Sequence, residues 1–379
     1  SCKVGKSYVR PDLHLPDSLE RSQDSVSFGA QDWRDIYTDA TLRSLIERAL
    51  DHNKDMLIAA ARVKEMAAQK RISTAALLPD IKGKVTGERE LENHGGDAFK
   101  RSDTFEAQFL VSWELDLWGN LRWARSASIA EYLQSIEAQR ALQMTIVAEV
   151  AQAYYELVAL DTELDIVKQT LKAREEGVRL ARIRFAGGLT SETSYRQAQV
   201  ELARTATLVP DLERKISLKE NDIAYLAGEY PNKIARSRLL QEFNSPETLP
   251  VGLPSTLLER RPDIRQAEQK LIAANAKVGV AYTNMFPRLA LTGGFGSEST
   301  SLSELLKSPY AIMEGALLTP IFGWGKNRAA LKAKKAAYEA EVHSYEKSVL
   351  EAFKETRNAI VNFNTVSYTH LRAHETRED

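Results

Sequence analysis

The sequence predicts a mainly α-helical chain that also contributes two pairs of β-strands, and three observations support this prediction. An apolar period of 3.5 residues runs from Val150 to Leu226 with one short interruption. A two-residue alternation of apolar and polar side chains occupies much of residues 79–118. The order of elements before residue 118 then recurs in residues 255–325. Long coiled-coil helices, strand pairs and an internal duplication therefore define the expected fold.

The first segment, residues 1–40, is expected to form an N-terminal arm that lies on the body of the protein. Prolines are scattered through residues 11–40, and no helical or strand period is sustained there. Cys2 is the only cysteine, so a disulfide within the chain is impossible. Cys2 is therefore either a free thiol in a disordered tail or an acylation site that becomes exposed when a signal peptide is removed.

The first repeat, residues 41–230, is expected to begin with a helix from about Ala40 to Ala76, followed by the strand pair of residues 79–118. In its second strand the odd-numbered residues are apolar, and only Leu110 breaks the alternation. The polar, even-numbered set consists of Thr104, Glu106, Gln108, Ser112, Glu114 and Asp116. A sheet on a soluble core would show the same alternation, but the neighbouring long helices leave no spare apolar layer to cover it.

A coiled-coil hairpin is expected across residues 119–230. Its strict 3.5-residue apolar seam, in which Arg174 is the one polar position of the first arm, predicts supercoiled helices. The turn between the arms is too short to join anything except antiparallel neighbours. It consists of Gly187, Gly188, Leu189, Thr190 and Ser191, which we call the tip. Pro210 should bend or split the returning helix because proline lacks an amide hydrogen.

A linker with several prolines is expected in residues 231–254, before a second repeat in residues 255–365. Asp55 corresponds to Asp263, and Pro79 to Pro287, at one constant offset. The expected elements are a helix at Ser255–Tyr282, strands at Arg288–Gly296 and Tyr310–Phe322, and a helix from Lys326. By analogy this repeat should continue into its own hairpin, so we expect a C-terminally truncated chain whose last residues, 366–379, are not native.

Four strands in one chain cannot close a barrel. An unclosed sheet in lipid leaves backbone groups unpaired, at several kcal/mol each, so closure would have to come from other copies of the chain. Three copies would supply twelve strands around an aqueous lumen, and the helices would form a hollow α-barrel. The odd-numbered apolar set would face lipid. The lumen would be lined by Thr104, Glu106, Gln108, Ser112 and Glu114.

Four motifs resemble those of the NodT-type efflux lipoproteins, a branch of the TolC-like outer membrane factor family. They are Leu249 to Glu268, Ala186 to Ser191 at the tip, Leu226 to Pro231, and Thr319 to Gly325. The run from Cys2 to Pro11 is similar to the mature start of these lipoproteins, which implies that Cys2 is the lipid attachment site. The resemblance covers residues 2 to about 365.

The resemblance implies a homotrimeric duct that is anchored by lipid in the Gram-negative outer membrane and extends into the periplasm. Such a duct docks through the tip on a periplasmic adaptor protein. The adaptor connects it to an inner-membrane pump, commonly of the resistance-nodulation-division class. The protein would be a passive, gated exit for small molecules, without cofactor or chemistry. Members of the family close at the second hairpin, which is absent here, so no gate residue is assigned.

Other function classes find little support in the sequence. The formal net charge of −1 gives no sign of nucleic-acid binding. No two of His14, His52, His94 and His343 have metal-ligand spacing, and His370 and His374 lie in the final segment. No phosphate-binding loop or nucleophile elbow is present, so an enzyme is not expected. The alternative that stays open is a soluble coiled-coil scaffold or adhesin stalk, which would purify without detergent.

We expect intact-mass spectrometry of the mature native protein to show added acyl mass at Cys2. A single acyl chain gives only marginal membrane anchoring, so more than one chain should be attached. A free thiol at this position would contradict the assignment.

Overall fold

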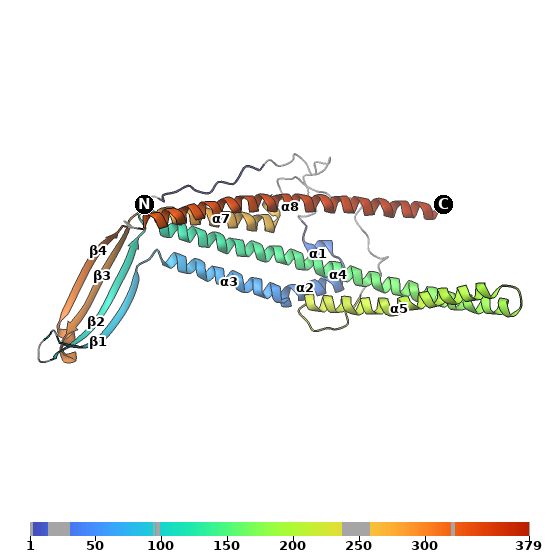
Figure 1. Cartoon of the computed structure of the whole chain (residues 1–379), viewed down its shortest axis with the longest axis horizontal. Helices are drawn as coiled ribbons and strands as arrows, with labels where there is room; N and C mark the ends of the chain where they lie inside the picture. The colour runs from blue at the N-terminus through green and yellow to red at the C-terminus, as the bar shows by residue number, and fades with distance from the viewer. Residues whose placement is uncertain are drawn as a thin grey trace. The chain divides into compact units, whose positions relative to one another are not determined.

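The computed structural model describes residues 3–13, 31–93, 95, 99–236, 258–319 and 323–378. The chain divides into two compact units. The first unit comprises Ser1–His14, Arg62–Glu137 and Leu258–Phe353, and the second comprises Leu15–Ala61, Ala138–Leu257 and Lys354–Asp379. Figure 1 labels the helices and strands. Cys2 and most of the expected linker lie outside the described residues.

The first unit contains one antiparallel sheet with the strand order β1-β2-β3-β4. The strands are β1 (Asp80–Glu92), β2 (Lys100–Leu115), β3 (Arg288–Ser299) and β4 (Pro309–Leu318). A short 3₁₀ helix, η3 (Leu302–Lys307), lies between β3 and β4. Both expected strand pairs are therefore present, and each repeat contributes one of them. Pairing of β2 with β3 joins the two repeats into a single sheet.

The strand register gathers the apolar side chains on one face of the sheet. Val111 on β2 stands opposite Ile81 on β1 and Gly293 on β3, and Gly293 stands opposite Met313 on β4. Large exposed apolar side chains on this face are Ile81, Val85, Phe109, Val111, Trp113, Phe295, Met313 and Leu317. The two-residue alternation thus produces an apolar face that spans all four strands.

Leu110, the single exception in the alternation of β2, is explained by its neighbours on the opposite face. It stands opposite Gly294 on β3, and Gly294 stands opposite Ile312 on β4. A Cβ atom on Gly294 would lie 3.2 Å from both Leu110 Cδ2 and Ile312 Cγ1. The two side chains therefore cover the glycine and form a small apolar contact on the face that carries most of the polar side chains.

Four helices adjoin the sheet in the order of its strands. They are α3 (Lys54–Ala75), α4 (Asn120–Ala186), α7 (Pro262–Thr283) and α8 (Trp324–Glu378). Lys70 of α3 lies over the Tyr132 ring of α4 at 4.2 Å. Ion pairs join α4 to α7, between Glu131 and Lys277 at 2.6 Å, and α7 to α8. The expected duplication appears as two copies of a helix–strand–strand–helix unit.

The start of α4 is fixed by side chains at the end of β2. Asp116 accepts hydrogen bonds from the backbone amides of Leu121 at 3.1 Å and Arg122 at 3.0 Å, which satisfies free N–H groups of the first turn. Gly119 adopts φ = +84°, a conformation that other residues rarely accept. The Asn120 amide donates to Thr283 Oγ1 at 2.9 Å, so the start of α4 is fastened to the end of α7.

The second unit has its own apolar core. Helix α2 (Ala40–His52) packs there with residues of α4 and with α5 (Glu192–Leu226), and α1 (Trp33–Ile36) precedes them. The most deeply buried side chains are Leu42, Leu45, Ile46, Val150, Tyr154, Leu157 and Ile223. The Tyr154 hydroxyl donates to Asp39 Oδ2 at 3.0 Å, and Asp39 caps α2. The buried Asp39 carboxylate is therefore hydrogen-bonded on both sides.

Helices α4 and α5 form the expected coiled-coil hairpin within the second unit (Figure 1). Most seam positions are buried or half-buried, whereas Arg174 is exposed. Helix α5 is continuous through Pro210, so the alternative in which proline splits the helix is wrong. Pro210 and Ala206 are both exposed, and water can therefore satisfy the carbonyl that proline leaves without a donor.

The helix expected from Ala40 to Ala76 is instead two helices, and this prediction was wrong. Helix α2 ends at His52 and α3 begins at Lys54. Asn53, 4% exposed, accepts hydrogen bonds from the amides of Asp55 at 2.9 Å and Met56 at 3.2 Å. Its Nδ2 atom donates to the Leu226 carbonyl at 2.9 Å. Asn53 thus caps α3 and satisfies the end of α5.

Helix α8 continues to Glu378 and so includes nearly all of residues 366–379, which we expected to lack regular apolar periodicity. In the part of the chain that the structure describes, no helix combines the length and the hydropathy that a membrane span requires.

We expect Asn53→Ala to lower the free energy of unfolding by about 1–3 kcal/mol. The variant loses a helix cap and leaves the Leu226 carbonyl without its donor. Thermal unfolding in detergent, followed by circular dichroism, would measure the loss. Asn232→Ala is the control, because Asn232 is exposed and hydrogen-bonds only locally. Equal effects of the two variants would show that Asn53 has no special role.

Candidate functional site

The predicted lumen-facing residues lie on one face of β2, opposite to the apolar face. Ser112 stands opposite Asp80 on β1 and Thr292 on β3, and Thr292 stands opposite Glu314 on β4. Thr104, Glu106, Gln108, Ser112 and Glu114 are the β2 members of this face. The polar set that was predicted from a single strand is therefore part of a polar face that extends across the whole sheet.

Two of these residues, Glu106 and Gln108, belong to a hydrogen-bonded cluster. Lys84 Nζ lies 3.0 Å from Glu106 Oε2, and the Thr86 hydroxyl donates to the same oxygen at 3.1 Å. The Tyr310 hydroxyl donates to Glu106 Oε1 at 2.7 Å and lies 3.2 Å from Gln108 Oε1. The cluster ties β1, β2 and β4 together on the polar face.

Gly296 makes the contact between Tyr310 and β2 possible. It stands in register between Gln108 on β2 and Tyr310 on β4. A Cβ atom there would lie 2.5 Å from the Ala107 carbonyl oxygen, so only glycine fits. Tyr310 can therefore reach across β3. Sequence reasoning missed Tyr310. Two signals were available: a glycine inside a strand, and a tyrosine at a position of β4 whose side chain alternates onto the polar face.

The described part of the N-terminal arm, residues 3–13, lies on α4 and α7, and we call it the strap. Val4 donates its amide to the Trp118 carbonyl at 3.0 Å and accepts from Trp123 Nε1 at 2.8 Å. The Lys3 ammonium lies 3.5 Å from the centroid of the Trp123 ring. Burial lowers the pKa of Lys3. Gly279 allows the close packing, because a Cβ atom there would lie 2.3 Å from Trp123 Cδ2.

The other half of the strap is held by Glu268 on α7. Arg10 binds both carboxylate oxygens, at 2.6 Å and 2.7 Å, and the Tyr8 hydroxyl donates to Glu268 Oε1 at 3.1 Å. Glu268 is 9% exposed, whereas the Arg10 side chain is 48% exposed, so the carboxylate of this bidentate pair is shielded from water and the guanidinium is not. Burial, together with the Glu268 charge, raises the pKa of Tyr8. The strap is therefore fastened at both ends, and Cys2 directly precedes its Trp123 end.

The tip closes the hairpin through backbone hydrogen bonds. Gly188 adopts φ = +74° and donates to the Phe185 carbonyl at 2.9 Å, while Leu189 donates to the Arg184 carbonyl at 2.9 Å. This pattern ends a helix with glycine in the left-handed conformation. The rings of Phe185 and Tyr195 stack with centroids 6.0 Å apart. The Leu189 side chain takes no part in closure and is 78% exposed.

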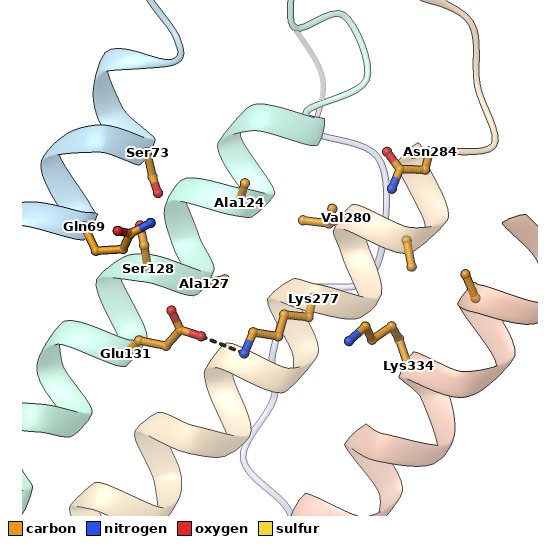
Figure 2. A pocket seen from close by; sticks show the side chains of 12 residues that line it. Gln69, Ser73, Ala124, Ala127, Ser128, Glu131, Lys277, Val280, Asn284 and Lys334 are labelled. Carbon is orange, nitrogen blue, oxygen red and sulfur yellow. Dashed lines mark ion pairs between the residues drawn. The ribbon is translucent and has the colours of Figure 1, made fainter. Parts of the chain in front are cut away.

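A cavity that the sequence did not predict lies among the four helices of the first unit. Its volume is about 320 Å³, and its lining comes from α3, α4, α7 and α8. Figure 2 shows the ion pair between Glu131 and Lys277, two of the lining residues, and the Lys334 side chain extending from α8 toward Lys277. Its lining combines alanines with lysine, serine and amide side chains.

The described residues contain no cluster of the kind that holds a metal ion. No three His, Cys, Asp or Glu side chains among them lie close enough together to hold a metal ion. The polar clusters instead join strands, helices and the strap.

Comparison with known proteins gives a consistent result. The sequence model of a family described as outer membrane efflux protein matches residues 45–229 and 253–377. The chain is 32% identical over 388 residues to the outer membrane protein OprJ of Pseudomonas aeruginosa, which covers 97% of this chain and 78% of OprJ. It is 29% identical over 366 residues to the cation efflux system protein CusC of Escherichia coli, covering 95% of this chain and 79% of CusC.

Solved structures of channels have the same fold. The outer-membrane channel OprN superposes with a TM-score of 0.91 at 28% identity, over 100% of this chain and 86% of OprN. A crystal structure of CusC gives a TM-score of 0.89 at 28% identity, over 99% of this chain and 86% of that one.

Proposed function

Because the chain belongs to the outer membrane efflux protein family, it is an outer-membrane efflux duct, and we propose that three copies close into one channel. The observation that supports this most directly is the sheet. Among the described residues its outer strands, β1 and β4, each pair on one side only, and its apolar face spans all four strands. A sheet of this kind is stable in lipid only when neighbouring copies pair with both edges.

The polar face would then line the lumen. Twelve strands from three chains enclose an aqueous channel, and the polar side chains of β2 would meet water there. The cluster of Lys84, Glu106 and Tyr310 would stiffen the wall from inside. Its hydrogen bonds hold β1, β2 and β4 of one chain together before the copies assemble.

We further propose that lipid on Cys2 anchors the duct. The strap is fixed beside Trp118 and Gly119, where β2 passes into α4. Cys2 directly precedes this segment in the sequence, so acyl chains on Cys2 would enter the inner leaflet of the outer membrane near the boundary of the sheet. Anchor and sheet would act at the same membrane level.

The tip is proposed as the docking surface for a periplasmic adaptor protein, which would connect the duct to an inner-membrane pump of the resistance-nodulation-division class. Leu189 exposes an apolar side chain to solvent, and the hydrogen bonds that close the hairpin come from the backbone of the tip. The duct itself would perform no chemistry. A soluble scaffold, the alternative left open by the sequence, would leave the apolar face of the sheet uncovered in water.

Val111→Arg should reduce trimer assembly in the outer membrane, because an arginine facing lipid near the midplane costs about 2–4 kcal/mol. Ser112→Arg is the matched variant, since the next residue on β2 is also exposed and lies on the polar face. It should assemble at the wild-type level and alter conductance in planar bilayers. Similar yields and conductances of the two variants would contradict the assignment of lipid and lumen faces.

Leu189→Ser should leave the trimer yield unchanged but reduce efflux and crosslinking to the adaptor. The substitution touches neither Gly188 nor the stack of Phe185 on Tyr195. Phe185→Ala serves as a control that weakens the hairpin, and it should lower trimer yield as well. If Leu189→Ser shows the same efflux and the same crosslinking to the adaptor as the wild type, the tip only closes the hairpin and is not a docking surface.

A further inference from the structure

The cavity among the four helices opens on the side of the helix row that faces away from the strap. On α7 the strap contacts Glu268 and Asn275, whereas Lys277 and Asn284 line the cavity. At 3.6 residues per turn these two pairs lie on opposite sides of the helix. Four helices lie side by side in a row, in the order α3, α4, α7 and α8. Residues from all four line the same cavity, which is possible only if the row is curved and the cavity lies on its concave side.

A groove along α7 shares Glu131, Lys277 and Lys334 with the cavity, and charged side chains line both. The charged residues lining the cavity and its continuation are Glu131, Lys270, Lys277, Lys334 and Glu341. Glu131 pairs with Lys277 at 2.6 Å, and Lys270 pairs with Glu341 at 3.2 Å. Among the described residues Lys334 has no ion-pair partner, and its ammonium points into the cavity (Figure 2). The groove therefore keeps one uncompensated positive charge in each chain.

The uncharged part of the lining combines small apolar side chains with polar ones, Gln69, Ser73, Ser128 and Asn284. Ala124, Ala127, Val280, Ala281 and Ala330 surround the charged groups. The volume of about 320 Å³ is within the range of small-molecule sites, and alanine side chains leave space for a ligand's apolar part. An ammonium group beside alanines and hydrogen-bonding serine and amide side chains suits an organic anion, such as a sulfonate or carboxylate on a small ring.

We infer that this groove is a contact site for small organic anions inside the duct, with Lys334 as the residue that binds the acidic group. The inference rests on the proposed closed channel, in which the concave side of each helix row faces the lumen. Three chains would place three Lys334 side chains around one level of the duct. This ring of lysines would raise the concentration of anions at its own level of the duct. The acidic residues on the polar face of the sheet lie at a different level.

The test is the ratio of chloride to potassium permeability, measured from the reversal potential of the native protein in planar bilayers under a potassium chloride gradient. Lys334→Gln should lower the ratio by about twofold or more at roughly 10 mM salt, where screening extends over roughly 30 Å. The effect should shrink at roughly 1 M salt, where screening falls to roughly 3 Å. Benzenesulfonate should reduce the wild-type current more than that of Lys334→Gln.

Lys332→Gln is the matched control. It removes the same charge from the same helix, but Lys332 lies on the other side of α8, away from the cavity. It should leave the permeability ratio and the benzenesulfonate effect at wild-type values. An unchanged ratio in Lys334→Gln, or an equal shift in Lys332→Gln, would overturn the anion site while leaving the duct intact. Failure of the wild-type protein to conduct would instead contradict the proposed channel.

Discussion

The open edges of the four-stranded sheet are the constraint on which the rest of the structure depends. Within the described part of the chain, strands β1 and β4 each have one side without a strand partner, and an apolar face covers all four strands. Hydrocarbon cannot satisfy unpaired backbone groups, so the sheet requires neighbouring copies. The helices follow the strand order, and thus the edges of the helix row and of the sheet coincide. Glycines such as Gly296 and Gly279 then allow the close contacts that hold one chain's sheet and strap in place.

Much of this arrangement could be predicted from the sequence because it depends on periodicity. Alternation in β2 predicted which side chains share a face, and a 3.5-residue seam predicted the α4–α5 hairpin. The repeat predicted that a second strand pair would resemble the first, and β3 and β4 confirm it. Each of these features depends on residues that are close together in sequence, or on a pattern that recurs along it, so the sequence alone is enough to predict them. The shared face of Glu106 and Gln108 on β2 could be predicted for the same reason.

What could not be predicted depends on contacts between residues far apart in sequence. The break at Asn53 was missed because the apolar positions Ala49 and Met56 keep the helical spacing across it, while the cap and the bond to Leu226 form only after folding. The strap has no period, and its partner Glu268 lies on α7. In the sequence Lys334 cannot be told apart from other lysines on an exposed helix face. Only the packing of α7 against α8 places Lys277 and Lys334 at the same cavity.

The central claim is that β1 of one chain pairs with β4 of the next to close a ring of three. Cysteines at Val85 on β1 and Met313 on β4 test it, since both side chains are exposed on the apolar face. Within one chain three strand spacings, about 14 Å, separate these strands, so a shorter bifunctional thiol reagent should link only different chains. In native outer membranes we expect linked species of two and three chains and none larger, with no linkage in Val85→Cys alone. An unlinked double variant, or a ladder that continues beyond three chains, would contradict closure by three copies.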